Sequence, residues 1–526
     1  MKRFALTLAL AACGEVHDPG AGDDAPPALA VHADGRHFVR LGGQLVAPIT
    51  VERNAASGPV AVSIANLPAG VTADPVEIAA DATTGELVLH ADPAAAFARL
   101  ALDVTATAGD ATATAPLDVE VIGRPGTLDP TVGTGGVQSF VASDKDETPQ
   151  FAIAQDDRLV IGVSVRRNGR EGLLVIRRGR DGAADPTFGA GGEAYFDLGA
   201  AGFTTGISVR ALAQPDGKIV IAGSGSNGTD GDLFLVRITA DGQVDPAMPL
   251  GTLDGSTLSL SLSALALAPD GGIVLAGTRS FQDNSDGFVL RTAASGTRDA
   301  TFGSDGLALV DTIRFDTISG VAVQEDGRVV VLGSVSSGAE FEIPRAVLRR
   351  LGVDGQLDPA FGDAGVAVLP TPESFAAGNA LVSPDRRQLV VAGAVRQSFA
   401  TADLGIWRYT ADGQLDPGFA GGTGYYAEPA TTTMDAVQRV EVAADGSIYG
   451  IGLEADNFGE VARLSIVHLD AAGNPDPGFG DAGIVRDTAT DMVRATALRD
   501  DFRLIVVGSP LLPSDTNDSS LRSYWR

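Results

Sequence analysis

Residue types able to do chemistry are unevenly represented in this sequence. Asp and Glu together number 67, whereas there are five His and one Cys in 526 residues. This scarcity argues against disulfide scaffolds, Cys-based zinc sites and most His-dependent catalysis. The chain also lacks a Gly-x-Ser-x-Gly elbow, a phosphate loop, a zinc motif and a sialidase-type Asp box. We assign no catalytic residues at this stage, and any catalysis would have to rest on carboxylates.

Two groups of residues are candidates for ligand binding. Four loops are rich in side-chain oxygens, and Ca²⁺ binds six to eight oxygen ligands, so Ca²⁺ is a candidate ion. None of these loops matches the EF-hand pattern, and the alternative is that they are solvated turns. The candidate metal ligands are Asp230, Asp232, Asp283 and Asp286. Four aromatic residues form a candidate ligand-binding rim, or else cap the core: Phe281, Phe341, Phe399 and Phe458.

The charge of the chain restricts its partners. The formal net charge is −29 at pH 7, and the basic residues are almost all Arg. Such a surface repels phosphate backbones and anionic lipid headgroups, so we expect no nucleic-acid partner. We expect a monomer whose partner is a protein or glycan ligand, and whose contact with a membrane is through a lipid anchor only.

The N-terminus indicates export. Residues 1–12 combine a basic start, a short apolar run and small residues, as in a secretory signal peptide. Leu10-Ala11-Ala12-Cys13 resembles the bacterial lipobox, which implies that Cys13 becomes the acylated first residue. The alternative is an ordinary signal peptide with an incidental Cys. Residues 13–27 read as the lipidated Cys and a flexible tether. The expected location is a bacterial outer membrane or cell surface, and otherwise periplasmic or secreted.

Residues 28–124 are predicted to form a first domain. Short runs of alternating apolar and polar residues, separated by Gly, Pro and Asp, are typical of half-buried strands in a β-sandwich. The segment NLPAGVT at 66–72 and the ending ATATAPLDVEV resemble Ig-like modules of bacterial surface proteins. His32, His37 and His90 lie in this region, and we interpret them as solvated or packed side chains in preference to metal ligands.

The rest of the chain, residues 126–526, is repetitive. The phrase Asp-Pro-x-Phe-Gly, or a variant, recurs every 54 to 60 residues, a period suited to four-stranded propeller blades. Each unit also holds a strand–Asp-Gly–strand phrase and a strand ending in Arg, with His468 in the sixth Arg position. The repeated phrase begins at Asp129, Asp185, Asp245, Asp299, Asp358, Asp416 and Asp476.

These phrases resemble the delta-60 repeat, a β-propeller family of bacterial secreted and cell-surface proteins. Each unit would supply strands A and B around the Asp-Gly turn, strand C up to the Arg, and strand D after Asp-Pro-x-Phe-Gly. The repeat region opens with a D strand near Val137 and closes with a C strand near Tyr524. We therefore predict an all-β protein, an Ig-like β-sandwich followed by a seven-bladed β-propeller, closed by N- and C-terminal strands sharing one blade.

The repeated residues have a structural interpretation. An array of similar units needs the same contacts at each interface, so the repeated Asp, Phe and Arg are expected to pack unit against unit, with Arg pairing to Asp. The Asp-Gly turns are expected to be two-residue type I′ hairpins.

Two functions are compatible with these observations. The first is a surface-anchored lipoprotein that acts as a non-enzymatic binding scaffold through a propeller rim, and this is the interpretation we favour. The alternative is a secreted carboxylate-based hydrolase or lyase with its site in the propeller funnel. An enzyme would need clustered acids there, and a pair of them at hydrolase spacing.

Overall fold

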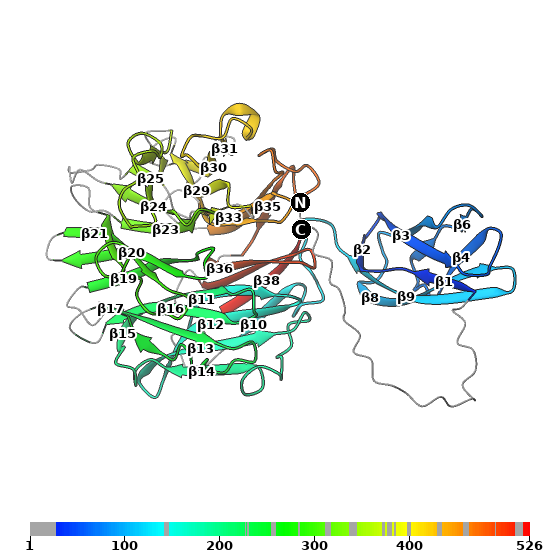
Figure 1. Ribbon diagram of the computed structural model, residues 1–526, viewed down its shortest axis with the longest axis horizontal. Helices are drawn as coiled ribbons and strands as arrows, with labels where there is room; N and C mark the ends of the chain where they lie inside the picture. The colour runs from blue at the N-terminus through cyan, green and yellow to red at the C-terminus, as the bar shows by residue number, and fades with distance from the viewer. Residues whose placement is uncertain are drawn as a thin grey trace, which may run out of the picture. The chain divides into compact units, whose positions relative to one another are not determined.

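The computed structural model is almost entirely β-structure (Figure 1). In its described part, the only helix is the short 3₁₀ helix η1 (Ala420–Gly422), and no helix has the length and apolarity needed to cross a membrane. The chain divides into two compact units, Met1–Ile122 and Gly123–Arg526. The structure describes residues 28–140, 147–226, 228, 231–253, 259–281, 284–310, 317–335, 345–370, 374–375, 381–382, 385–396, 401–428, 434–455, 462–489, 491–510 and 519–526.

The first unit contains two sheets around one apolar core. Its strands alternate buried and exposed residues, so each sheet turns one face inward, as in β3, where Ala47, Ile49 and Val51 are buried. One sheet has the order β1 (Leu29–His32), β3 (Gln44–Arg53), β7 (Thr84–Ala91), β5 (Val71–Ala73). The other has the order β2 (Arg36–Arg40), β9 (Ala111–Ile122), β8 (Ala98–Ala108), β4 (Val60–Ala65), β6 (Val76–Ile78).

The second unit is built of antiparallel sheets that follow one another along the chain. Four of them are β11 (Thr148–Gln155), β12 (Arg158–Arg167), β13 (Arg170–Arg178), β14 (Glu193–Asp197); β15 (Thr205–Ala213), β16 (Ile219–Ser226), β17 (Gly231–Ile238), β18 (Gly251–Thr252); β19 (Ser259–Leu267), β20 (Ile273–Phe281), β21 (Asn284–Thr292), β22 (Leu307–Val310); and β23 (Thr317–Val323), β24 (Val329–Val335), β25 (Arg345–Leu351), β26 (Val366–Val368).

A larger sheet combines the next two repeat units, because β30 and β32 pair in parallel at Ala402 and Met434. Its path is β27 (Ser374–Phe375), β29 (Gln388–Arg396), β30 (Ala402–Thr410), β32 (Met434–Val442), β33 (Ile448–Ala455), β34 (Ala462–Leu469), β35 (Ile484–Asp487), with β28 (Leu381–Val382) on β29 and β31 (Tyr425–Ala427) on β30. The last sheet has the order β10 (Val137–Phe140), β38 (Ser519–Trp525), β37 (Arg503–Pro510), β36 (Asp491–Arg499).

The two ends of the second unit meet in this last sheet. In Figure 1 the red strand β38 lies beside the cyan β10, and Val137 is the register partner of Arg522. The inner strands β11, β15, β19, β23, β28, β32 and β36 contact one another in that order, and β36 contacts β11. Ile161 and Ile505 belong to one buried cluster across that last contact. The sheets therefore form a closed ring whose inner strands are the first strand of each unit, and we call the region that these inner strands surround the central channel.

The Asp-Gly turns differ from the prediction. In the β15–β16 hairpin, the Gln214 N–H donates to Lys218 O at 2.8 Å, and the Gly217 N–H donates to Gln214 O at 3.0 Å. Three residues therefore separate Gln214 from Lys218, and among these three Gly217 alone takes a positive φ, of 80°. This is a type I turn with a glycine bulge, and the two-residue type I′ expectation is wrong. The added residue lets the Asp216 carboxylate accept the Lys218 N–H at 3.1 Å.

The repeated Arg and Asp pair in successive units, with Phe beside them in most units, and we call this contact the Arg latch. Arg350 Nε donates to Asp358 Oδ2 at 2.9 Å and Nη1 donates to Ala411 O, in the turn of the next unit, at 2.8 Å. Its guanidinium lies over the Phe361 ring at 5.0 Å. The corresponding ion pairs are Arg177–Asp185, Arg237–Asp245, Arg291–Asp299, Arg408–Asp416 and His468–Asp476. The predicted pairing is confirmed, and it stabilises contacts between neighbouring units.

Candidate functional site

The four aromatic residues predicted to form a rim do not form a describable patch. Phe341, Phe399 and Phe458 lie outside the described residues. Phe281 is the last residue of β20, and its backbone pairs with Asn284 across the hairpin. The aromatic rim therefore stays a prediction.

The predicted metal ligands are only partly described. Asp230 and Asp283 lie outside the described residues. The carboxylate of Asp232 accepts the Leu233 N–H at 2.7 Å, and that of Asp286 pairs with Arg279 in a buried position. Within the described ranges, no three His, Cys, Asp or Glu side chains gather as a metal site would require. The Ca²⁺ site also stays a prediction.

The histidines of the first unit have separate neighbours. His90 Nε2 lies 3.1 Å from an Asp74 oxygen, and His32 Nε2 lies 3.6 Å from a Glu52 oxygen. His37 Nε2 lies 3.1 Å from the Asp34 carbonyl oxygen. These partners agree with the interpretation of the three histidines as ordinary surface side chains.

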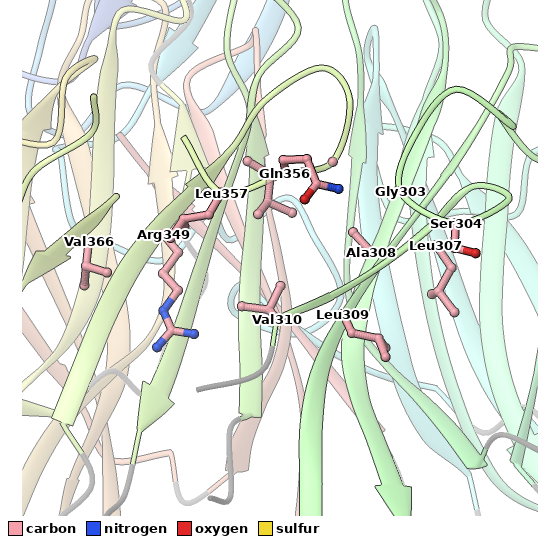
Figure 2. Close-up of a pocket in the computed structure, with 12 residues that line it drawn as sticks. Gly303, Ser304, Leu307, Ala308, Leu309, Val310, Arg349, Gln356, Leu357 and Val366 are labelled. Carbon is pink, nitrogen blue, oxygen red and sulfur yellow. The ribbon is translucent and has the colours of Figure 1, made fainter. Parts of the chain in front are cut away.

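A cavity of about 570 Å³ lies between two neighbouring sheets of the ring (Figure 2). Leu307, Leu309 and Val310 of β22 line one part of it, and Arg349 of β25 and Leu357 line another. Its lining residues are mainly aliphatic and include no carboxylate. This cavity is therefore a poor place for carboxylate chemistry.

The carboxylates converge elsewhere, at strand ends of the β30–β35 region. Arg486 of β35 pairs with Glu428, which follows β31, and its Nε lies 2.9 Å from Glu454 Oε2 at the end of β33. Asp403 of β30 and Asp435 of β32 are buried and close enough to act on Glu428 electrostatically. We call these five residues the rim cluster. The strand ends that carry them lie next to the segments that join strand B to strand C and strand D to strand A.

The rim cluster contains one carboxyl with unusual acidity. The Glu428 side chain is only 4% exposed, against 17% for Glu454 and 35% for Arg486. Burial raises the pKa of Glu428 to about 7, Arg486 opposes this shift, and Asp435, Glu454 and Asp403 add to it. A carboxyl with such a pKa is partly protonated at neutral pH, so it can donate a proton.

A second unusual carboxyl lies on an inner strand of the ring, where two inner strands meet. Thr496 of β36 donates to Glu441 of β32 at 2.6 Å, and burial raises the pKa of Glu441 to about 7. Arg439 lies on the same strand as Glu441, and Arg210 and Arg494 act electrostatically on Arg439. We call Glu441 and these three arginines the channel cluster.

Sequence reasoning missed both clusters, although the repeats contain a signal for them. Glu428 takes the fourth position after the glycine that opens strand D, where other units have Phe196, Val310 and Leu369 and the next unit has Asp487. A carboxyl group at a position that is apolar in several units marks a departure from the repeat. Asp403 was closer to being found, because it lies five residues before the Arg position, as do Asp232 and Asp286 in their units.

Comparisons with known proteins agree with the architecture. A family model described as a domain of unknown function (DUF5122) beta-propeller matches residues 214–247, 268–302, 324–361 and 387–419. No curated protein matches the sequence.

Similar solved structures include an endo-arabinase from Bacteroides thetaiotaomicron, with 10% identity, a TM-score of 0.30, and coverage of 73% of this chain and 96% of that one. A GH32 β-fructofuranosidase from Bombyx mori has 8% identity, a TM-score of 0.28, and coverage of 75% and 92%. The catalytic domain of a GH62 α-L-arabinofuranosidase from Coprinopsis cinerea has 14% identity, a TM-score of 0.26, and coverage of 58% and 95%.

These comparisons correct the favoured functional prediction. The non-enzymatic scaffold is contradicted, since the three solved structures named above are carbohydrate-cleaving enzymes, the class nearer to the alternative prediction. TM-scores of 0.26 to 0.30 carry no argument about this chain, so an activity has to be argued from its own residues. The sheets and the four matched segments together support a β-propeller repeat architecture for the second unit.

Proposed function

We propose that the chain is a carboxylate-based glycoside hydrolase that acts at the rim cluster. The observation that carries this proposal is that one guanidinium, Arg486, binds two carboxyl groups, one of which has its pKa raised to about 7. Glycoside hydrolysis uses a pair of Asp or Glu residues, one protonated and one ionised. Paired carboxyls in different environments are the usual way to obtain both states at one pH.

The two carboxyls have different roles in this proposal. Glu428 is the general acid, which protonates the leaving glycosidic oxygen. Glu454 is the more exposed of the two and acts on the anomeric carbon. Because both bind neighbouring nitrogens of one guanidinium, we place them nearer to the short separation of retaining enzymes, about 5–5.5 Å, than to the wider inverting one. Glu454 is then the nucleophile, and the anomeric configuration is retained.

The charge around the site supports a cationic transition state. Asp403 and Asp435 add two carboxylates to Glu428 and Glu454, whereas Arg486 is the cation bound to the pair. Glycoside cleavage passes through an oxocarbenium-like state that carries positive charge. An excess of nearby carboxylates stabilises that state more than the neutral substrate, which is the condition for catalysis.

The test is hydrolysis of a panel of 4-nitrophenyl glycosides and neutral polysaccharides by the full chain. Glu428→Gln and Glu454→Gln should each lower kcat by roughly 10²–10⁴-fold. Glu193→Gln is the matched control, since Glu193 is an exposed residue of the D strand β14 in another unit. Retention is checked by NMR of the first-formed product. Activity that survives both substitutions at the rim cluster would contradict the proposal.

We further propose a more detailed architecture. The order of the inner strands from β11 to β36 supports seven blades, with one blade shared by β10 and the C-terminal strands. The repeated phrases support membership in the delta-60 repeat family, with the propeller at 126–526. The two-sheet arrangement of the first unit supports an Ig-like module at 28–124. A cryo-EM or crystal structure that gives another blade count would contradict this.

We also propose that Cys13 is lipidated and holds the protein at a cell surface. The support is the Leu10-Ala11-Ala12-Cys13 segment and the absence of any other Cys. Intact-mass measurement should show a diacyl or triacyl adduct that Cys13→Ser lacks, and the wild type should enter the detergent phase of a Triton X-114 extraction. Partition of both proteins into the aqueous phase would rule the anchor out.

A further inference from the structure

Three arginines lie on different inner strands of the ring and act on one another electrostatically: Arg210 of β15, Arg439 of β32 and Arg494 of β36. Arg210 and Arg439 each lie seven residues before their turn glycine, Gly217 and Gly446. The same position is Ala264 in one unit and Gly320 in another. The two arginines therefore depart from a position that is small elsewhere, and the repeated fold does not require them.

The arginines are held in place by neutral groups. Arg210 Nε donates to Ser263 O at 2.8 Å, and Nη1 donates to Val209 O at 2.9 Å. Arg439 binds equivalent acceptors, with Nη2 to Arg494 O and Nη1 to Gln438 O, both at 2.8 Å. Arg494 Nε donates to Ser509 Oγ at 2.8 Å. These bonds fix the guanidinium groups through neutral acceptors, and the carboxyl that acts electrostatically on Arg439 is that of Glu441.

The local charge balance is positive. None of these three arginines has a carboxylate within ion-pair distance in the described part of the chain, and the acid of the channel cluster is Glu441. Burial lowers the pKa of Arg439 to about 10, Arg210 and Arg494 add to this by repulsion, and Glu441 opposes it. A guanidinium still keeps its charge at neutral pH. Like charges gathered in a partly buried place are costly unless a counter-charge joins them.

We propose that the central channel binds a small oxyanion, a carboxylate, sulfate or phosphate group, between Arg210, Arg439 and Arg494. Guanidinium groups recognise such oxyanions through paired N–H donors. In a chain of net charge −29, an anion meets a repulsive outer surface, so affinity has to arise from a specific positive site. This site lies on other strands than Glu428, Glu454 and Arg486 and does not depend on the proposed hydrolysis.

Calorimetry on the full chain tests this proposal, with sulfate, phosphate and citrate as probes at an ionic strength matched by NaCl. We expect saturable binding of at least one probe. The double variant Arg210→Gln/Arg439→Gln should bind it about tenfold more weakly or worse. Arg463→Gln is the control, since Arg463 is an exposed arginine of β34. No binding above the NaCl background, or binding that the double variant retains, would overturn the proposal.

A second variant tests the site by a gain of affinity, which a folding defect cannot produce. Glu441→Gln removes the competing carboxylate and keeps a group that can accept the Thr496 hydrogen bond. At pH 8 this variant should bind the same probe several-fold more tightly than the wild type, and at pH 5 the difference should shrink, because Glu441 is then mostly protonated. Weaker binding by Glu441→Gln at pH 8 would exclude an oxyanion in contact with this cluster.

Discussion

The rim cluster and the channel cluster contain the same unusual group in opposite surroundings. Glu428 and Glu441 both have pKa values raised to about 7, mainly by burial. At the rim, the other nearby groups are mostly carboxylates around one arginine, Arg486. In the channel, the nearby charged groups are arginines. A raised pKa alone therefore does not define a function, and the sign of the neighbouring charges has to decide it.

That difference separates two kinds of ligand. Surplus carboxylates at the rim favour a group that becomes positive during reaction, as a sugar ring does when its glycosidic bond breaks. Surplus arginines in the channel favour a group that is negative from the start. The two clusters also differ in how they depend on the ring, because the rim cluster comes from one sheet that contains β30 to β35, whereas the channel cluster needs strands from three separate sheets.

Removal of β38 should open the closed ring and should give the largest effect. Deleting residues 519–526 leaves β37 and β10 without their shared partner, β38, and exposes the edges of both strands. Exposed strand edges pair with other chains, so we expect aggregation or a large fall in melting temperature. Anion binding should be lost with the ring. An unchanged melting temperature in differential scanning calorimetry would contradict the closure.

Replacing Arg486 should change both the acidity of Glu428 and the activity proposed for the rim cluster. Arg486 opposes the rise in the pKa of Glu428, so Arg486→Gln should raise that pKa further. We expect kcat to fall by about tenfold or more, because the two carboxyls lose their common partner. The alkaline limb of the pH–rate profile should move to higher pH, since the general acid stays protonated longer. A lower rate with an unmoved alkaline limb would indicate that Arg486 supports structure without acting on Glu428.

The repeated sequence predicted the contacts between units but did not predict the two clusters. Position-by-position repetition predicted the Arg latch correctly, since Arg350, Asp358 and Phe361 recur for a packing reason that each unit shares. The two proposed sites use departures from the repeat, such as Glu428 at a position that is apolar in several units and Arg439 at a position that is small in several units. A departure that occurs in only one or two units is not marked by the period of the repeat. Its neighbours, such as Arg486, lie in another unit and become visible only when the sheets are placed side by side.

Breaking the Arg latch should lower the stability of the fold by an intermediate amount and should leave both clusters in place. The Arg350 side chain is 4% exposed, and Arg350→Gln leaves Asp358 with Arg328 alone, whose Nε lies 3.1 Å away. Breaking a buried ion pair by removing one partner costs about 3–5 kcal/mol, and the second cation should keep the loss near the lower end. Chemical denaturation would measure it against Arg463→Gln. A loss within about 0.5 kcal/mol, the usual size for surface changes, would show that the latch is not stabilising.

The pH dependence of stability should give the smallest effect and compare the latch with the two clusters directly. Hydrogen bonds and arginines lower the pKa of latch aspartates, and that of Asp245 falls to about 2. A carboxyl with a lowered pKa stabilises the fold above its unfolded value, and this contribution is lost as the pH falls from about 4 towards 2. Glu428 and Glu441 change the stability with pH in the opposite direction. Their folded pKa values of about 7 exceed the ordinary 4.5, so stability falls as the pH rises between those values.

These two limbs together predict a melting temperature that is highest near pH 4 to 5. Glu428→Gln and Glu441→Gln should each flatten the decline above that maximum, by roughly 1–3 kcal/mol for a shift of this size, and should leave the acid limb in place. The latch variant Asp245→Asn should flatten the acid limb instead. Melting temperatures in buffers of constant ionic strength from pH 2 to 8 would measure both limbs. If the two glutamine variants followed the wild-type curve above pH 5, neither glutamate would be held protonated by its surroundings, and the basis for comparing the two clusters would be removed.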